Sequence, residues 1–420
     1  MQAEPDYYCW NSGSSDPDPF LIGIDSSLSL YDWQKHDLEF ALLAARRQNV
    51  PLLISTAGDT GTDSRVDLYV ECLRHLSQKH NLPSLTLAYF YTEVPKHLLD
   101  RYSEQVPVMR EQHNGKTISE TDFEQTDRVL SIAGAHPYLR ALETGADIII
   151  GGRSCQTSMI AAVALHQGFP ASTAYSLGYV LGQYQYAAIP GQALLGAITD
   201  DTVKLCHLVP PEHQNGAWCP VPAPADLTHV QTPDGMLDVS ACDYHRIDDA
   251  TIEIRNAAFL PPDNPIQIHL EGVGKVGERH VGILSVSDSA GLDHLEGFFD
   301  WTLTQIADHF TGKFYQLTYQ VYEQYPLSSA SSPSSEPSRA RFLLIEGIAE
   351  TGQLAEELTI MATRILMTAG SIAKNRPDES PLLTLESILA APPVYRWTIQ
   401  HTLPLANSHD FFKLHVVTLG

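Results

Sequence analysis

The sequence contains little cysteine, and its cysteines do not form a recognisable framework. Six cysteines are spread over 420 residues, and no two of them make a CxxC pair. Neither a disulfide scaffold nor a zinc knuckle is therefore indicated, and we expect a reducing compartment. Cys155 falls at an expected helix start, where it is compatible with a nucleophile or with a small residue in a tight turn.

Basic residues and long apolar runs are also scarce. The chain has 26 Lys and Arg against 50 Asp and Glu, so its formal net charge is −24. Nucleic acid and anionic membrane surfaces would be repelled, because the densest basic spot is only Arg46-Arg47. No stretch approaches the length of about 18 apolar residues that a membrane span needs, and the N-terminus lacks the pattern of a secretory signal. We therefore expect a cytoplasmic protein with no nucleic-acid or membrane partner.

Several motifs that would identify a cofactor or a reaction are absent. The loop Gly58–Gly61 fits neither G-x-G-x-x-G nor a Walker sequence, and the chain has no HExxH and no G-x-S-x-G. We therefore predict no cofactor and no resident metal. One alternative stays open, because Asp59 and Asp63 could hold a divalent cation through their oxygens, although they are equally suited to capping a helix.

What the first half does contain is a repeated alternation of strand, polar turn and helix. This alternation predicts right-handed βαβ units, and hence an open parallel sheet with helices on both faces in an α/β domain over residues 1–222. The expected strands are Phe20–Ile24, Pro51–Ser55, Leu85–Tyr91, Val129–Ile132 and Ala146–Ile150, and the clearest helices are Tyr31–Arg47 and Ser64–Lys79.

The second half has a different pattern. Proline clusters suggest a boundary near residue 222, and residues 223–420 alternate in a way that predicts a smaller α+β domain with antiparallel strands. The Ser/Pro-rich segment Leu327–Arg339 is expected to be a mobile loop. Just before the boundary, Leu194–Leu205 is expected to be helical. The glycine-rich stretch Glu271–Gly277 is expected to be a tight hairpin, or else a lip over the binding pocket.

The stretch Gly145–Ser158, GADIIIGGRSCQTS, is the strongest candidate for a binding site. A short apolar strand runs into two glycines, a hydroxyl-rich turn and a helix, which is a typical arrangement for an anion pocket. Arg153 could clamp a carboxylate or phosphate through two hydrogen bonds. The alternative is an ordinary strand–helix connection with Arg153 in a structural ion pair, and the sequence leaves both open.

Polar residues also follow the other expected strands. Ligands of open α/β sheets bind outside the carboxyl ends of the strands, so we expect these side chains to converge. The candidate proton-transfer residues are Asp59, Glu93 and His136. The candidate substrate- and anion-binding residues are Gly58, Thr60, Gly61, Gly152, Arg153, Ser154, Thr157 and Tyr175, of which Tyr175 is also compatible with a partly buried helix residue.

The segments DPDPFLIGIDSS, ISTAGDTGTDSRVD, GAHPYLRALETGADIIIGGRSCQTS, LEGVGKVGER and PVYRWTIQHTL occur in this order. With them the chain resembles the acyclic terpene utilisation protein AtuA family over about residues 10 to 405. The resemblance implies breakdown of branched or terpenoid acids, often beside acyl-CoA enzymes, but it carries over no active residues. The Ser/Pro-rich insert departs from the family pattern and suggests recruitment to a secondary-metabolite pathway.

Together, these features predict an acid–base enzyme. We expect a lyase or isomerase, such as a hydratase or dehydratase, acting on a small or branched carboxylic acid or its acyl-CoA thioester, because such reactions need only proton-transfer groups and an anion clamp. The alternative is a non-catalytic acyl- or carboxylate-binding subunit, or scaffold, of a larger complex. In either case we expect a homo-oligomer.

Overall fold

The structure of the protein is a computed structural model. It describes residues 4–13, 19–100, 110–111, 118–184, 194–207, 228–248, 251–262, 267–286, 295–323, 341–373, 383–404 and 411–420. The chain forms two compact units, the first comprising Met1–Gly274 with Trp397–Gly420 and the second Lys275–Arg396.

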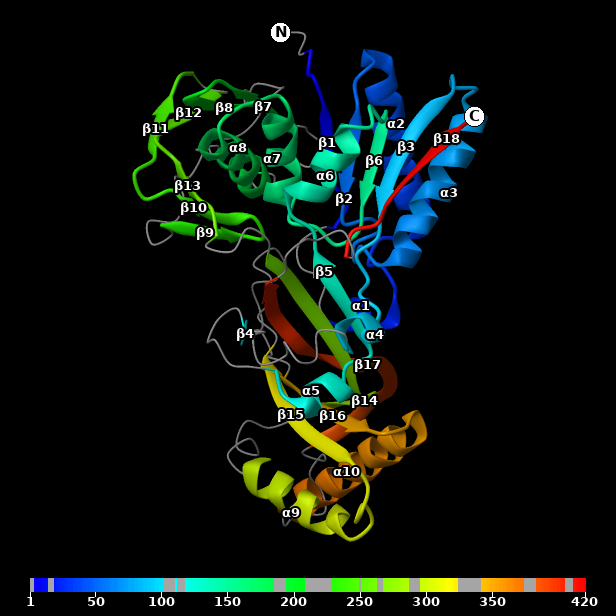
Figure 1. The fold of residues 1–420 in the computed structure, drawn as a ribbon. Helices are drawn as coiled ribbons and strands as arrows, with labels where there is room; N and C mark the ends of the chain where they lie inside the picture. The colour runs from blue at the N-terminus through cyan, green and yellow to red at the C-terminus, as the bar shows by residue number, and fades with distance from the viewer. Residues whose placement is uncertain are drawn as a thin grey trace, which may run out of the picture. The chain divides into compact units, whose positions relative to one another are not determined.

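The first unit is built on a mainly parallel five-stranded sheet with the order β1-β2-β6-β3-β18 (Figure 1). Its strands are β1 (Tyr8–Asn11), β2 (Leu52–Ser55), β6 (Ile148–Gly151), β3 (Leu85–Phe90) and β18 (Leu414–Leu419). The first four strands pair in parallel, and β18 joins β3 antiparallel. The carboxyl ends of β2, β6 and β3 therefore lie at one edge.

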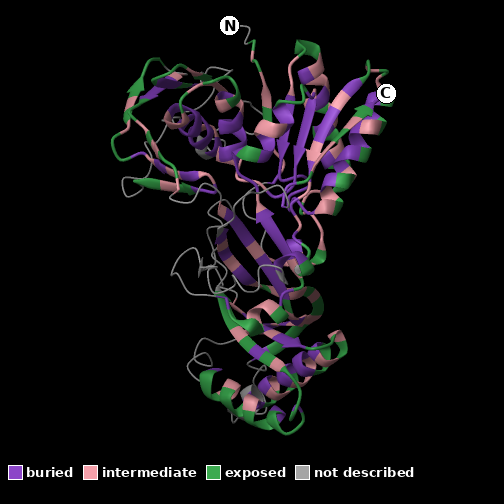
Figure 2. Cartoon of the chain, viewed as in Figure 1, coloured by how far each residue is buried: buried purple, intermediate pink, exposed green. Residues whose placement is uncertain are grey.

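The central strands are continuous apolar runs. Because successive side chains of a strand point to opposite faces, apolar residues cover both faces of the sheet. Ile148 and Ile150 pack with helices α2 (Tyr31–Gln48) and α3 (Asp63–Lys79). Ile149, between them, packs with α6 (Ala135–Leu142) and α7 (Gln156–His166) on the other face. The central strands β2 and β6 are accordingly buried throughout and β3 largely so, whereas the edge strands β1 and β18 are partly exposed (Figure 2).

Two small antiparallel sheets and several short elements complete the first unit. One sheet has the order β13-β10-β9 and the other β11-β12-β8-β7. Their strands are β7 (Leu194–Ile198), β8 (Thr202–His207), β9 (His229–Thr232), β10 (Gly235–Asp238), β11 (Asp243–Arg246), β12 (Thr251–Arg255) and β13 (Ala258–Leu260). The remaining elements are α1 (Pro19–Ile24), α4 (Lys96–Asp100), β4 (Arg110–Glu111), α5 (Glu120–Glu124), β5 (Arg128–Ile132) and α8 (Ala171–Tyr184).

The second unit has an antiparallel sheet with helices. Two long strands, β14 (Gln267–Val286) and β17 (Leu383–Pro404), run through parts of both units. Within the second unit, β14 pairs with β16 (Arg341–Ala349), which pairs with β15 (Tyr315–Glu323). Helices α9 (Leu295–Ala307) and α10 (Gly352–Ala373) pack on this sheet around a core that includes Leu284, Ile306 and Leu358.

The predicted fold class is confirmed as a mixed α/β protein with a mainly parallel sheet and additional antiparallel sheets. Two local predictions are wrong. Phe20–Ile24 lies in helix α1 instead of a strand, and Pro19 occupies the first helical position, where its fixed φ favours a helix. Leu194–Leu205 is a hairpin of β7 and β8 instead of a helix, because Thr199–Thr202 closes a turn through the 2.9 Å bond from Thr199 N to Thr202 O.

Two further predictions concern strand pairing, and the structure corrects both. The strand β5 pairs antiparallel with β14 and is not part of the parallel sheet. The stretch Glu271–Gly277 is neither a hairpin nor a lip, since it lies inside the continuous strand β14. Its glycines serve close packing: a Cβ on Gly272 would lie 2.8 Å from the Ile399 side chain, and one on Gly274 only 2.0 Å from Gln125 O.

Two predictions concern residues that the structure does not describe. The boundary between residues 222 and 223 and the segment Leu327–Arg339 both lie outside the described residues, so these remain predictions. Among the described helices, none combines the length and the apolar character that a membrane crossing requires.

Candidate functional site at the carboxyl ends of the sheet

Three loops meet at the carboxyl ends of β2, β3 and β6, as the sequence suggested. The backbone N–H of Arg153, after β6, donates to Gly61 O at 3.0 Å and to Thr92 Oγ1 at 2.7 Å. The Thr92 hydroxyl in turn donates to Gly61 O at 3.1 Å. The loop 56–62, the end of β3 and the segment 152–154 are therefore bonded directly to one another.

The glycines in these loops allow backbones to approach each other closely. Gly61 has a φ of +68°, and a Cβ there would lie 2.3 Å from Arg153 N. A Cβ on Gly152 would lie 2.4 Å from Thr92 Oγ1, and Gly58 has a φ of +60°. Gly61 and Gly152 are thus required for loop packing, whatever they contribute to ligand binding.

The Arg153 side chain is buried and ion-paired. Its Nε donates to Glu271 Oε2 at 2.9 Å, and the two side chains are only 8% and 13% exposed. Glu271 belongs to β14, so this pair links the parallel sheet to the strand beside β5. The geometry matches the structural alternative for Arg153, and its use as a substrate clamp remains a prediction.

Asp59 has local partners that account for its position. Its Oδ2 accepts hydrogen bonds from Leu28 N at 3.0 Å and Ser29 N at 3.2 Å, and from the Ser27 hydroxyl. The Asp59 side chain is buried, and its φ is +68°. It therefore fixes the loop that leads into α2, and no other proton-transfer candidate is among these partners.

Glu93 lies in a half-exposed cluster with Asp63 and Arg128. Glu93 Oε1 accepts from Asp63 N at 3.1 Å, while Asp63 Oδ1 accepts from Glu93 N at 3.0 Å. The Arg128 guanidinium donates to the same Glu93 oxygen. Burial, reinforced by the charges of Glu93 and Asp67, raises the pKa of Asp63 to about 6 although backbone hydrogen bonds oppose the rise. Asp63 is thus poised to exchange a proton near neutral pH.

Asp25 brings a second arginine to this cluster. Its Oδ1 accepts hydrogen bonds from Thr62 Oγ1 at 2.5 Å and Ser64 Oγ at 2.7 Å, and its Oδ2 lies 3.8 Å from Arg128 Nη2. Arg65 Nε lies 3.8 Å from Oδ1. Burial alone would raise the pKa of Asp25, but these hydrogen bonds and the two guanidiniums outweigh it and lower the pKa.

His136 and Tyr175 lie at a different place, around Asp234. Both Asp234 carboxylate oxygens accept from Ala135 N, each at 3.0 Å, at the N-terminus of α6. Burial raises the pKa of Asp234, although Ser158, Ala135 N, Tyr175 and His136 each lower it. Burial and the Asp234 carboxylate likewise raise the pKa of Tyr175. The Tyr175 ring is buried and stacks on Phe259, with ring centroids 4.0 Å apart.

The three remaining candidates make structural contacts. Ser154 Oγ donates to Gly152 O at 2.8 Å and is 2.8 Å from the Tyr138 hydroxyl. Thr60 is fully buried, with its hydroxyl 3.3 Å from that of Thr62. A Cβ added to Gly178 would lie 2.1 Å from Thr157 O, because α7 and α8 pack closely there.

Five charged residues of these clusters were not identified from the sequence: Asp25, Arg65, Arg128, Asp234 and Glu271. Asp25 and Arg128 flank expected strands, and their spacing gives no sign that they meet. Glu271 lay in a presumed hairpin, and Asp234 lies in the turn TPDG, which resembles an ordinary surface turn. Only their long-range contacts reveal them: Asp234 is 99 residues from Ala135, and Glu271 is 118 residues from Arg153.

A divalent cation at Asp59 and Asp63 is the open alternative to the prediction of no resident metal. The two carboxylates have separate partners, Asp59 in the loop 27–29 and Asp63 at the end of β3. Within the described part of the chain, no group of three or more His, Cys, Asp or Glu side chains has an arrangement that could hold a metal ion.

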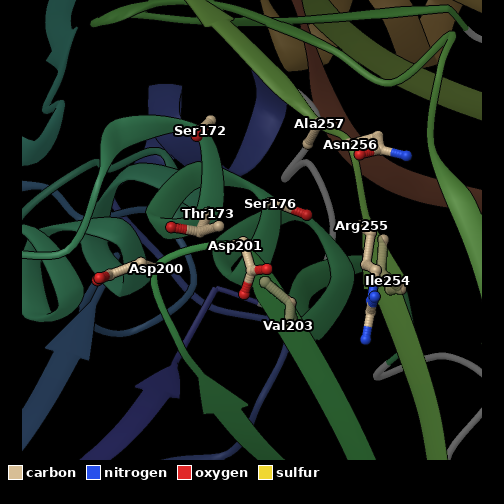
Figure 3. A pocket seen from close by; sticks show the side chains of 10 residues that line it. All are labelled: Ser172, Thr173, Ser176, Asp200, Asp201, Val203, Ile254, Arg255, Asn256 and Ala257. Atoms are coloured by element: carbon tan, nitrogen blue, oxygen red, sulfur yellow. The ribbon is translucent and has the colours of Figure 1, made fainter.

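A small polar pocket lies elsewhere in the first unit (Figure 3). It has a volume of about 220 Å³ and lies among the first turns of α8, the turn between β7 and β8, and the end of β12. Its polar lining includes Ser176, Asp200, Asp201 and Arg255. None of the candidate residues from the sequence lines it, and Arg255 is already paired with Glu253, with Nε 2.8 Å from Oε1.

The fold and these clusters define a mixed α/β protein whose parallel sheet carries charged groups at the carboxyl ends of its strands. Residues 30–176 match the family model of the acyclic terpene utilisation family protein AtuA, which confirms the resemblance over that segment. The match includes Asp63, Glu93, Arg128 and Arg153, but not Asp25, Asp234 or Glu271. No curated protein and no solved structure matches the chain.

Proposed function

We propose that the protein is a lyase or isomerase, specifically a hydratase or dehydratase, acting on a small or branched carboxylic acid or its acyl-CoA thioester. The observation that carries this proposal is the half-exposed cluster of Asp63, Glu93 and Arg128, in which the pKa of Asp63 is raised to about 6. A carboxyl group with such a pKa can both accept and donate a proton near neutral pH.

The cluster contains the groups that such a reaction needs. In a dehydration, a base removes the proton next to the carboxylate or thioester, the leaving hydroxyl takes up a proton, and water departs without any change in oxidation state. Asp63 is our candidate for the proton-transfer group. Glu93 is held by Arg128 and by Asp63 N at 3.1 Å, which favours a positioning role.

Two guanidiniums of the cluster reach solvent, since the side chains of Arg128 and Arg65 are 24% and 23% exposed. Arg128 is paired with Glu93 and Asp25. Arg65 is paired with Asp25, so a substrate anion would share both guanidiniums with these carboxylates. Arg153 is much less accessible, with 8% of its side chain exposed. We therefore assign the carboxylate or thioester contact to Arg128 and Arg65. The proposed setting, terpenoid or acid breakdown or a secondary-metabolite pathway, is supported by the family match.

The test combines substrate discovery with a matched pair of variants. Incubating the purified protein with a panel of carboxylic acids and CoA esters, analysed by mass spectrometry for gain or loss of water and for isomers, should identify a converted compound. Asp63→Asn should then lower kcat by about a hundredfold or more, the usual loss when a proton-transfer group is removed. Glu71→Gln, on the outer side of the same helix, should have no effect. Undiminished turnover by Asp63→Asn would contradict the proposal.

A non-catalytic acyl- or carboxylate-binding subunit, or scaffold, is the second candidate. Large apolar side chains on and before α2 favour it, because Leu28 and Phe40 are 74% and 73% exposed and such patches mark interaction surfaces. Thermal-shift measurements against the same panel discriminate the two functions. Stabilisation by a compound that mass spectrometry recovers unchanged would favour the subunit over the enzyme.

A further inference from the structure

The outer face of α2 presents large apolar side chains to solvent. Trp33 and Phe40 are 65% and 73% exposed, and Leu30, which caps the helix, is 62% exposed. Trp33 and Phe40 are seven residues apart, so two helical turns place them on the same side. A different face carries the buried residues of the helix, Gln34, Leu38, Leu42 and Ala45. The apolar side chains on the outer face therefore do not contribute to the core of the first unit.

These exposed residues belong to a regular row. The row comprises Leu30, Trp33, Asp37, Phe40, Ala44 and Arg47. Its spacing alternates between three and four residues, which is the spacing of a seam between two packed helices. The helix thus has two seams, one used by the sheet and one facing solvent. We call the second one the outer row.

The charge of α2 indicates what could pack on the outer row. The whole chain carries a net charge of −24, so two copies repel each other over most of their surface. In α2, by contrast, Arg46 is paired with Asp147, and Glu39 with Lys79 and His80. Of the remaining charges, Lys35 and Arg47 balance Asp32 and Asp37, so that 2 − 2 gives no net charge. A second copy can therefore approach through α2 without the general repulsion.

The distribution of charge along α2 also sets the direction. Asp32 lies in the first turn, and Arg46 and Arg47 lie in the last turn. Parallel helices would place like charges together and align their dipoles, whereas antiparallel helices bring Asp32 near Arg47 of the second copy and oppose the dipoles. A two-fold axis through the middle of the row would also place the bulky Trp33 of one copy opposite the small Ala44 of the other, so that the two helices can pack closely. We propose that the protein forms a two-fold dimer by packing the outer rows of two α2 helices antiparallel.

The first experiment measures the mass of the full-length protein in solution by light scattering and sedimentation at increasing concentration. The wild type should approach twice the 46.3 kDa of one chain. Trp33→Glu combined with Phe40→Glu should remain monomeric while keeping the wild-type circular dichroism spectrum. The control Leu389→Glu, at a 51% exposed position of β17, should dimerise normally. A wild type that stays monomeric at every concentration overturns the proposal.

A charge swap tests the antiparallel direction. Asp32→Lys and Arg47→Glu should each weaken the dimer by about tenfold, because every lost pair is solvent-exposed and occurs twice across the two-fold axis. The double variant Asp32→Lys/Arg47→Glu reverses both charges and should restore wild-type dimerisation. If the single variants dimerise as well as the wild type, or if the double variant is as weak as the singles, the antiparallel arrangement is wrong.

Discussion

Two carboxyl groups near the carboxyl-terminal edge of the parallel sheet have a raised pKa, but their surroundings differ. Asp63 is half-exposed, next to Glu93 and its partner Arg128. Asp234 lies deeper in the protein, accepts hydrogen bonds from Ala135 N on both carboxylate oxygens, and also interacts with the side chains of Ser158 and Tyr175. In our proposal, the first centre exchanges protons with a ligand and offers it a cation. The second is suited to attaching the β9–β10 hairpin to the N-terminus of α6, where the helix dipole favours a carboxylate.

The comparison shows why a raised pKa alone does not identify a reactive group. Burial is the largest cause of the rise for both Asp63 and Asp234. What differs is access to solvent and the presence of guanidiniums. The following predictions test this division of roles, beginning with the largest expected effect.

Arg153→Ala tests whether Arg153 is an anion clamp or part of the scaffold that both centres share. Removing the guanidinium leaves Glu271 buried without its 2.9 Å partner, so the free energy of unfolding should fall by about 3–5 kcal/mol. Urea denaturation measures this loss. The double variant Arg153→Met/Glu271→Gln removes both charges and should recover much of the stability. A single variant as stable as the wild type would instead favour the clamp.

Gly61→Ala and Gly134→Ala compare the backbones of the two centres. A Cβ at Gly61 would lie 2.3 Å from Arg153 N and would also have to adopt a φ of +68°, so we expect a loss of more than about 2 kcal/mol. At Gly134 an added Cβ would lie 2.2 Å from Asp234 Oδ1 and would displace the Asp234 carboxylate from Ala135 N, but φ is −84°, so no backbone strain is added and the loss should be smaller.

Gly145→Ala is the control for this pair. Gly145 has a φ of +69° with nothing within 4 Å of an added Cβ, so it should cost only about 1 kcal/mol for the backbone conformation. Equal losses at Gly61 and Gly145 would show that the close approach of the loops does not contribute to stability.

Tyr175→Phe tests the second centre. Removing the hydroxyl takes away a hydrogen-bond partner of Asp234, and the free energy of unfolding should fall by about 1 kcal/mol. Tyr179→Phe, another buried tyrosine of α8, should change it less. In a turnover assay, Tyr175→Phe should leave the pH dependence of kcat unchanged. A shifted pH profile would mean that the Asp234 centre takes part in the reaction.

Elements with a strong local pattern could be predicted from the sequence. Tyr31–Arg47 and Pro51–Ser55 differ from α2 and β2 by only one residue at one end. The first has a clear helical period, and the second is a short apolar run that ends at polar residues. The predictions failed where tertiary contacts decide the structure. Glu271–Gly277 contains three glycines, yet it continues as a strand because neighbouring backbones and side chains press against them.

The site was predicted only in outline. The meeting of the Asp59–Asp63 loop with Arg153 follows from a general rule for parallel sheets, and Arg153 N does bond to Gly61 O. The partners of each side chain could not be predicted, since Glu93 pairs with Arg128 from β5 and Arg153 with Glu271 from β14. The antiparallel pairing of β5 and β14 joins segments more than a hundred residues apart, and no local pattern records it.

The most direct test of the central claim is the free energy of unfolding of wild type and Asp63→Asn, measured from pH 3 to pH 8. The pKa of Asp63 is raised from 3.8 to about 6 on folding, so the folded protein binds this proton more tightly than the unfolded chain. Relative to Asp63→Asn, the wild type should be most stable below pH 4, lose that advantage as the pH rises to about 6, and change little above it. A difference that stays constant over this range, or one that grows in favour of the wild type as the pH rises, would contradict the assignment of Asp63 as the proton-transfer group.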